Sequence, residues 1–120
     1  KLANVIFEGQ QKPLPYYQQA SIFLVTSACE GFSMTTLEAQ QCGCVPVVYD
    51  SFPTAHELVI NGKNGILIKN NDREAFVENL KHLILNDQLR HEMSMQCVES
   101  SHRFSVENVA TLWNNLLQSL

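Results

Sequence analysis

Two glutamates, Glu30 and Glu38, enclose a stretch of seven mostly small or polar residues. A carboxylate accepts two hydrogen bonds, so it suits a pair of vicinal hydroxyl groups such as those of a ribose or a hexose. Gly31 follows the first glutamate and allows the backbone to approach a ligand closely. A helix is predicted to start between Ser33 and Thr35, where free N–H groups and the helix dipole favour an anion, most often a phosphate.

Thr35 and Thr36 can add hydroxyl donors at this predicted helix start. The pattern therefore indicates a sugar on one side, a phosphate in the middle and a ribose on the other, which together make a nucleotide sugar. The alternative is that both glutamates only complement the helix dipole, because acidic residues are common in the first turns of helices. Spacing alone leaves both interpretations open.

The elements that must position these residues can be predicted from hydrophobic runs. Continuous apolar runs predict buried strands at residues 4–9, 21–27, 45–50 and 66–68. Helices are predicted at residues 14–20, 33–43, 54–60, 70–87, 87–103 and 106–120. Strands that are apolar throughout and alternate with helices are typical of a parallel sheet covered on both faces. We therefore expect an α/β fold, a Rossmann-like parallel sheet in a single domain over residues 1–120.

In open parallel sheets, ligands bind outside the carboxyl ends of the strands. The segment "VTSACEGF", which contains Glu30, is expected at such an end. Asp50 ends the next strand in the same position, where a site role and a turn role are both open. His56 is predicted either to contact the ligand or to face solvent, and Glu57 is either a site residue or an acid at a helix start.

Several residues are predicted to have structural roles. Asn71 is expected to cap the helix that follows it, and Ser105 to cap the last helix. Trp113 is expected in the core, with packing of its apolar stripe on a missing domain as the alternative. His82, His91 and His102 are expected on the surface. The four cysteines, Cys29, Cys42, Cys44 and Cys97, are expected to be buried, reduced thiols of a cytoplasmic protein.

Composition excludes several classes of function. The chain has 120 residues, of which 45% are hydrophobic and 17% charged, and its net charge is −4. Without a cluster of Lys and Arg, a nucleic-acid partner is not expected. No apolar run approaches the ~18 residues of a membrane span. The start of the sequence has no signal-peptide pattern, and it does not begin with Met.

The stretch "EGFSMTTLEAQQCGCVPVV" resembles the donor-binding signature of retaining, GT-B-type glycosyltransferases, the glycosyl transferases group 1. In that family, two glutamates are separated by seven residues, and a Gly-x-Pro-Val-Val strand follows. The segments "VIFEG", before the signature, and "ELVINGKNGILI", after it, are also similar. The resemblance covers residues 4–95, and its matching positions in the signature are Glu30, Gly31, Phe32, Glu38, Ala39, Gly43, Pro46, Val47 and Val48.

This resemblance implies a role for each matching site residue. Glu30 would be the catalytic residue that holds hydroxyls of the transferred sugar, and Glu38 would bind the ribose hydroxyls. The helix start near Thr35 and Thr36 would face the diphosphate. The remaining expected donor contacts are the backbone N–H groups of Gly31, Phe32 and Ser33 along the sugar, and Gly9 and Gln10 near the base.

The resemblance also implies cofactors and partners. No metal ion is expected, because the family holds the diphosphate with a helix dipole and basic side chains. The implied donor is a nucleoside-diphosphate sugar such as a UDP-sugar, and the implied acceptor is a saccharide or a lipid-linked molecule. The resemblance leaves room for peripheral association of the full-length enzyme with the inner face of the membrane.

The chain is expected to be the later part of the C-terminal domain of such an enzyme. The earlier strands, a basic pair and the N-terminal acceptor domain would be missing, so the isolated chain is expected to be inactive. The family implies a retaining hexosyltransferase of cell-surface polysaccharide or lipopolysaccharide synthesis. The loop "SFPTAHEL" replaces two family glycines and leaves the donor sugar open. The alternative function is a nucleotide-binding or assembly module without transfer activity.

Overall fold

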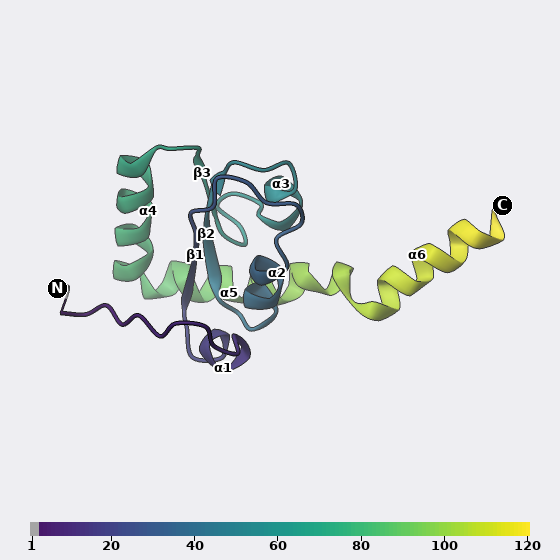
Figure 1. Ribbon diagram of the computed structural model, residues 1–120, viewed down its shortest axis with the longest axis horizontal. Coiled ribbons are helices and arrows are strands. Elements are labelled where there is room, and N and C mark those ends of the chain that lie inside the picture. Colours follow the sequence, from purple (N-terminus) through teal and green to yellow (C-terminus); the bar gives the residue numbers. More distant parts are fainter. Residues whose placement is uncertain (1–2) are drawn as a thin grey trace.

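The computed structural model describes residues 3–120, which fold around a three-stranded parallel sheet (Figure 1). Strands β1 (Ile22–Val25), β2 (Val45–Asp50) and β3 (Ile66–Lys69) lie side by side in that order. In the register of the sheet, Ile22 lies opposite Val45, and Val47 lies opposite Ile66. Because the strands are parallel, all three carboxyl ends lie at one edge of the sheet.

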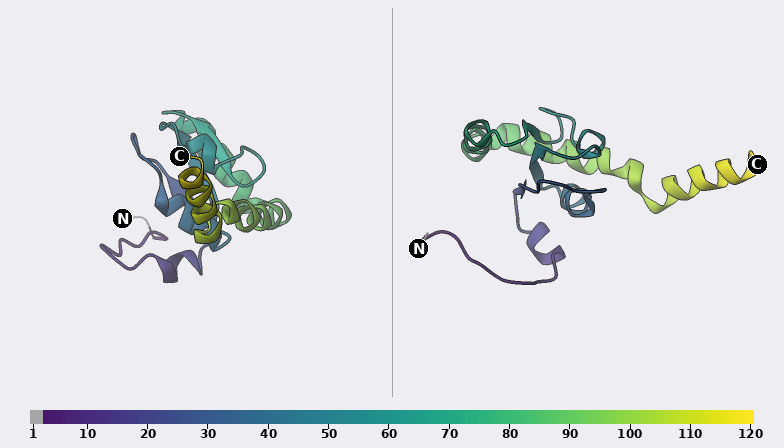
Figure 2. Two further views of the ribbon diagram at one scale, coloured as in Figure 1. Left: turned by 90° about the vertical axis from the view of Figure 1, so that its right-hand side faces the viewer. Right: turned by 45° about the horizontal axis from the view of Figure 1, so that its top comes forward.

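Helices cover both faces of this sheet, which confirms the predicted α/β, Rossmann-like class. The short helix α1 precedes β1, α2 connects β1 to β2, and α3 follows β2. Helices α4 and α5 follow β3, and a 3₁₀ turn, η1, leads into α6 (Figure 2). Their bounds are α1 Leu14–Tyr17, α2 Met34–Gln41, α3 Ala55–Leu58, α4 Arg73–Leu85, α5 Asp87–Ser101, η1 His102–Phe104 and α6 Val106–Gln118.

The central strand β2 explains why the sequence is apolar without interruption there. Val45 and Val47 pack on the side of α4 and α5, in a cluster that includes Leu83. Val48 packs on the opposite side, with Leu37 of α2 and other residues of the α2–α3 layer. Since both faces of the strand are buried, alternation between polar and apolar residues is lost.

The predicted strand at residues 4–9 is wrong. In the structure this segment is an irregular stretch, and the side chains of Ile6 and Phe7 are 80% and 91% exposed. A strand needs a neighbour to satisfy its backbone, and within residues 3–120 no strand pairs with this segment. The hydrophobic run alone could not supply that partner.

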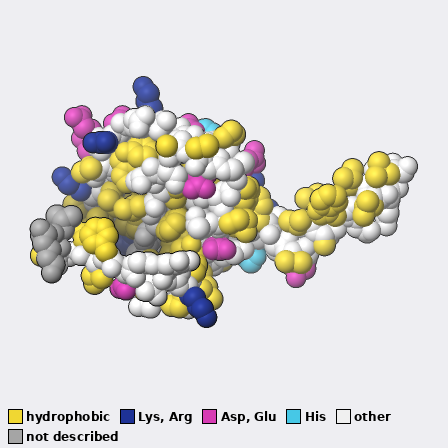
Figure 3. Space-filling view, in the orientation of Figure 1, with side chains coloured by type: hydrophobic (Ala, Val, Ile, Leu, Met, Phe, Trp, Pro, Cys, Tyr) yellow, Lys and Arg dark blue, Asp and Glu magenta, His cyan; other side chains and the backbone are white. Residues whose placement is uncertain are grey.

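Helix α6 carries the predicted apolar stripe, but the stripe is not part of the core. Trp113 is 61% exposed, so its predicted core position is wrong for the described part of the chain. The helix projects from the body of the molecule, and its hydrophobic side chains line the projecting arm in Figure 3. Among residues 3–120, no helix is long and apolar enough to cross a membrane.

The helix caps are partly as predicted. Ser105 caps α6 by accepting a hydrogen bond from the N–H of Asn108, which confirms that prediction. Asp72, and not Asn71, caps α4 by accepting from the N–H of Ala75 at 3.0 Å. Asn71 instead takes a left-handed conformation, with φ of 64°, in the turn before the helix. Asparagine tolerates that conformation better than most residues, so it serves the turn and leaves the cap to its neighbour.

The four cysteines are free thiols in two different environments. Cys44 and Cys97 are fully buried, as predicted, and both thiols donate to backbone carbonyls. Cys29 is exposed and Cys42 is half-buried, so the prediction that all four are buried is wrong. Cys29 lies in the irregular loop after β1, where its neighbours in sequence do not form a core.

Because Cys97 is buried, the free energy of unfolding is expected to decrease at alkaline pH. Burial, and secondarily the nearby Cys44, raises the pKa of Cys97 to about 12, against an ordinary value of 9.0. Above pH 9 the unfolded chain loses this proton while the folded chain keeps it, so stability falls as pH rises towards 12. The fall is about 1.4 kcal/mol per pH unit for one group.

We expect the free energy of unfolding of Cys97→Ala to fall less steeply between pH 9 and 11 than that of the unsubstituted protein. Urea unfolding at several pH values measures this slope. The matched control is Cys29→Ala at the exposed position, which should leave the slope unchanged. Equal slopes for Cys97→Ala and the unsubstituted protein would contradict the raised pKa of Cys97.

Candidate functional site

The loop after β1 presents Glu30 at the carboxyl edge of the sheet. The side chain is half-buried, and Ser27 Oγ donates a hydrogen bond to Glu30 Oε1 at 2.8 Å. Within residues 3–120, this is the one hydrogen bond found to that carboxylate. The contact fixes the orientation of the carboxylate and leaves acceptor capacity on Oε2 for a ligand.

The start of α2 is a helix end without a side-chain cap. Ser33 occupies the N-cap position, but its hydroxyl bonds to Thr36 Oγ1 at 2.8 Å instead of to a backbone N–H. Within residues 3–120, the N–H of Thr35 donates no hydrogen bond. An exposed N–H at the positive end of a helix of eight residues can bind an anion.

The hydroxyl groups of Ser33 and Thr36 differ from that of Thr35 in their access to a ligand. Both hydroxyls are buried and satisfied by each other, with 1% of each residue exposed. Thr35 is exposed, one residue before Thr36. Thr35 Oγ1 has a long contact to Ser33 Oγ, at 3.4 Å, so of the two threonine hydroxyls it is the one that can turn to a ligand. The Ser33–Thr36 pair supports the turn from inside.

Glu38 lies on α2 one turn after Met34, about 6 Å further along the helix axis. Its side chain is half-buried and is not enclosed by the core. The carboxylate lies near Tyr17 of α1: burial raises the pKa of Tyr17, and the charge of Glu38 raises it further. The structure thus places Glu30 ahead of the helix start and Glu38 beyond it.

Two predicted donor contacts lie away from regular structure. Gly9 and Gln10 are exposed and belong to the irregular segment before α1, where Gly9 has φ of 68°. Within the described residues, no hydrogen bond joins either of them to the Glu30 loop. Their predicted contact with the base stays a prediction.

Phe32 contacts a residue that the sequence did not single out. Its ring meets that of Phe104, in η1, edge to face, with centroids 5.5 Å apart. Arg103 lies over the Phe104 ring, 4.5 Å from the centroid. The turn between α5 and α6 therefore supports the loop that carries Glu30, although Phe32 and Phe104 are 72 positions apart in sequence.

The loop after β2 contacts the Glu30 loop directly. Ser51 Oγ donates to the carbonyl of Ser27 at 2.6 Å, and Thr54 Oγ1 donates to the carbonyl of Gly31 at 2.5 Å. The sequence alone did not identify these two hydroxyls. The one feature that could have indicated them is their position just after the end of a predicted parallel strand.

A second feature of the same edge is the pair formed by Asp50 and His56. Asp50 Oδ1 lies 2.9 Å from His56 Nε2, and both side chains are partly exposed. They line a cavity of about 540 Å³ together with Lys69, at the ends of β2 and β3. Glu57 is exposed in the first turn of α3. His82, His91 and His102 are exposed on the helical surface, as predicted.

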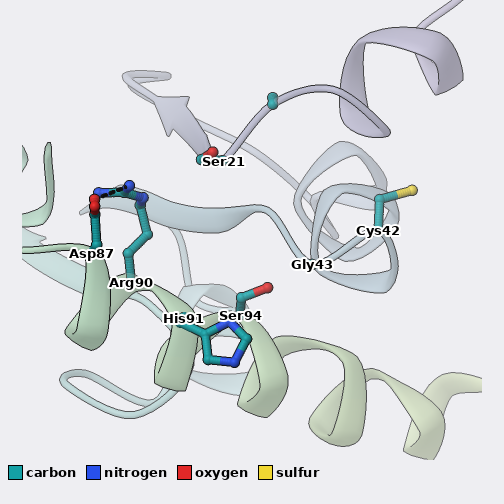
Figure 4. Close-up of a pocket in the computed structure, with 8 residues that line it drawn as sticks. Ser21, Cys42, Gly43, Asp87, Arg90, His91 and Ser94 are labelled. Atoms are coloured by element: carbon teal, nitrogen blue, oxygen red, sulfur yellow. Dashed lines mark hydrogen bonds and ion pairs between the residues drawn. The ribbon is translucent and has the colours of Figure 1, made fainter.

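Figure 4 shows a different cavity, of about 420 Å³, lined by residues of α5 and of the segments before β1 and β2. Its charged residues already have partners. Arg90 donates to the carbonyls of Leu83 and Ile84 at the end of α4 and pairs with Asp87. This arrangement stabilises the junction of α4 and α5, so the cavity does not compete with the edge of the sheet as a functional site.

Among residues 3–120, no group of three or more His, Cys, Asp or Glu side chains is arranged to hold a metal ion. The groups at the site are instead carboxylates, a hydroxyl and an exposed helix N–H. Carboxylates accept hydrogen bonds from hydroxyl groups, and a helix N-terminus attracts an anion. The arrangement can therefore bind a polyol and a phosphate in neighbouring positions.

Comparison with known proteins places the chain in a family. Its residues 1–97 match the family described as glycosyl transferases group 1. A D-inositol 3-phosphate glycosyltransferase of Corynebacterium urealyticum is 34% identical over 104 residues, which are 87% of this chain and 24% of that protein. A poly(glycerol-phosphate) alpha-glucosyltransferase of Bacillus subtilis is 29% identical over 111 residues, 92% of this chain and 16% of that protein.

A solved structure agrees with these sequence matches. HepE of Anabaena, in complex with UDP and glucose, aligns with 99% of this chain and 33% of its own chain, at 25% identity and a TM-score of 0.87. The chain thus spans a third or less of these related proteins. Its fold is that of the C-terminal domain of GT-B glycosyltransferases. On the match over residues 1–97, the chain belongs to the glycosyl transferases group 1 family.

Proposed function

We propose that the chain is the donor-binding part of a retaining hexosyltransferase that uses a nucleoside-diphosphate sugar, with UDP as the nucleotide. One observation carries this proposal: Glu30 is oriented by Ser27 immediately before the uncapped start of α2, and Glu38 follows on the same helix. The HepE complex with UDP and glucose supports the choice of donor. The alpha-glucosyltransferase relative supports a hexose as the transferred sugar.

Each group has a task in this proposal. Glu30 is the catalytic residue that binds hydroxyls of the transferred sugar, and Glu38 binds the two ribose hydroxyls. The N–H groups at the start of α2 lie against the diphosphate, with Thr35 as an additional hydroxyl donor. Negative charge develops on the leaving diphosphate as the bond to the sugar breaks. Fixed N–H dipoles aimed at that charge lower the barrier because they need no reorganisation.

The remaining features of the enzyme are also part of the proposal. The backbone N–H groups of Gly31, Phe32 and Ser33 run along the sugar, and Gly9 and Gln10 lie near the base. The diphosphate is held without a metal ion. The acceptor is a saccharide or a lipid-linked molecule bound by another domain, in cell-surface polysaccharide synthesis in the cytoplasm. Transfer requires that domain to close over the donor, so the 120-residue chain alone is inactive.

Titration with UDP-glucose and with UDP tests the proposal. The protein should bind UDP-glucose at least several-fold more tightly than UDP, because Glu30 contributes hydrogen bonds only to the sugar. Hydrogen bonds to a charged group contribute about 1.5–3 kcal/mol, so Glu30→Ala should remove this preference while UDP affinity stays the same. Binding should persist in a metal chelator.

The matched control is Glu78→Ala, at an exposed glutamate of α4. It should leave both affinities unchanged. Equal affinities of the unsubstituted protein for UDP-glucose and UDP would contradict a sugar-binding role of Glu30. That result would favour a nucleotide-binding module without transfer chemistry.

A further inference from the structure

We infer that the loop between β2 and α3, residues 51–54, positions the Glu30 loop, and that Ser51 and Thr54 are positioning residues for the sugar end of the donor. This inference rests on the proposed function of Glu30. Two side-chain hydroxyls of the loop after β2 donate to backbone carbonyls of the loop after β1. One of these carbonyls precedes Glu30 in sequence and the other follows it. Ser51 holds the carbonyl of Ser27, and Thr54 holds the carbonyl of Gly31.

The Glu30 loop needs support of this kind. Thr26, Ala28, Cys29 and Gly31 are exposed, so little packing fixes the backbone between β1 and Phe32, whose ring meets that of Phe104. Irregular segments with few buried contacts open at low free-energy cost. Hydrogen bonds to the backbone are therefore a main source of stabilisation for the conformation of the Glu30 loop.

The supporting loop is itself well anchored. Phe52 is 4% exposed and Ala55 is fully buried, both in the cluster that packs on β2. The pair of Asp50 and His56 joins the residue before this loop to α3 after it. A hydroxyl on such a segment has a defined position, so its hydrogen bond transmits that position to the Glu30 loop.

The geometry of the peptide bond links Thr54 to the ligand. The carbonyl of Gly31 and the N–H of Phe32 belong to one planar trans peptide and point in opposite directions. Because Thr54 binds that carbonyl, the N–H of Phe32 points away from Thr54. That N–H is one of the proposed sugar contacts, so Thr54 sets its orientation without touching the ligand.

Ser51 acts on Glu30 through Ser27. Ser27 accepts from Ser51 on its carbonyl and donates from its own hydroxyl to Glu30 at 2.8 Å. A change in the backbone at Ser27 therefore moves the hydroxyl that orients the carboxylate. Both hydrogen bonds act on groups that meet the sugar, and neither acts on the groups assigned to the ribose.

Thr54→Val, which keeps the shape of the side chain and removes the donor, tests this inference together with Ser51→Ala. Each should reduce the preference of the protein for UDP-glucose over UDP by about three- to tenfold, the value of one hydrogen bond. Affinity for UDP alone should not change. Thr54→Ser keeps the donor and should restore the preference.

Amide hydrogen exchange gives a second measurement that needs no ligand. Exchange across residues 27–32 should be faster in Thr54→Val and Ser51→Ala than in the unsubstituted protein. The control is Thr111→Val, which removes a similar bond, from Thr111 Oγ1 to the carbonyl of Glu107 on α6. Thr111→Val should change neither exchange in this loop nor the ligand preference.

The outcomes separate this inference from the proposed function. If the unsubstituted protein shows no preference for UDP-glucose, the role of Glu30 fails, and the claim of a positioning role for the sugar falls with it, whatever exchange shows. If that preference exists but survives in both Thr54→Val and Ser51→Ala, the positioning role is overturned while the function of Glu30 stands. Loss of preference with faster exchange, restored by Thr54→Ser, is the expected result.

Discussion

Glu38→Ala is expected to lower the affinity of the protein for UDP by about 10- to 100-fold. In the proposed complex, the carboxylate accepts hydrogen bonds from both ribose hydroxyls, and bonds to a charged group contribute about 1.5–3 kcal/mol. The side chain is half-buried beside Tyr17, so its orientation is already restricted before the ligand binds. Calorimetric titration with UDP measures the loss.

Glu38→Gln separates charge from shape in this prediction. Its amide keeps one acceptor oxygen, so affinity for UDP should fall less than in Glu38→Ala. Because the charge of Glu38 contributes to the raised pKa of Tyr17, both substitutions should also lower the pKa of Tyr17. An unchanged affinity for UDP in Glu38→Ala would remove the ribose contact from the proposed function.

Asn64→Ala is expected to destabilise the fold by about 3 kcal/mol or more. Asn64 is 2% exposed and its side chain makes three hydrogen bonds: it accepts from the N–H of Ile60 at 2.7 Å, and donates to the carbonyl of Leu58 at 3.0 Å and to Ser100 Oγ at 2.8 Å. Alanine would remove all three bonds. The carbonyl of Leu58 would keep its bond from Gln40 Nε2, at 2.9 Å, but the N–H of Ile60 would lose its partner. Each buried polar group left unsatisfied costs about 1–3 kcal/mol.

Urea denaturation monitored by circular dichroism measures this effect. Asn70→Ala is the matched control, because Asn70 is exposed in the turn after β3 and should change stability by less than about 0.5 kcal/mol. A similar small change for Asn64→Ala would show that water replaces the lost contacts. It would also imply that Asn64 does not hold the loop after α3 against α5.

The sequence predicted most elements that rest on local signals. β2 was predicted over 45–50 and is observed over Val45–Asp50, because its apolar run, ended by Asp50, is a strong local pattern. Helices α4, α5 and α6 were also predicted, since their length gives the periodicity several turns to appear. Helices α1 and α3 each have four residues and are shorter than predicted, because so short a helix carries little pattern of its own.

Two of the wrong predictions concern packing partners, whereas the helix cap predicted at Asn71 is an error of local conformation. The run at residues 4–9 has three consecutive apolar residues, Val5, Ile6 and Phe7, yet within the described residues no strand pairs with it. The stripe of α6 repeats as predicted, yet Trp113 is exposed. A hydrophobic pattern shows that a surface favours burial, and it does not show which surface will cover it.

The sequence alone determined the family, the α/β class and the order of Glu30, helix start and Glu38, because type and spacing along the chain are local facts. Only the tertiary structure decided that Ser51 and Thr54 reach the Glu30 loop, that Phe104 packs on Phe32, and that Asn64 is buried. Each of these contacts joins residues of different elements. Their proximity follows from the packing of the helices on the sheet, which no single stretch of sequence records.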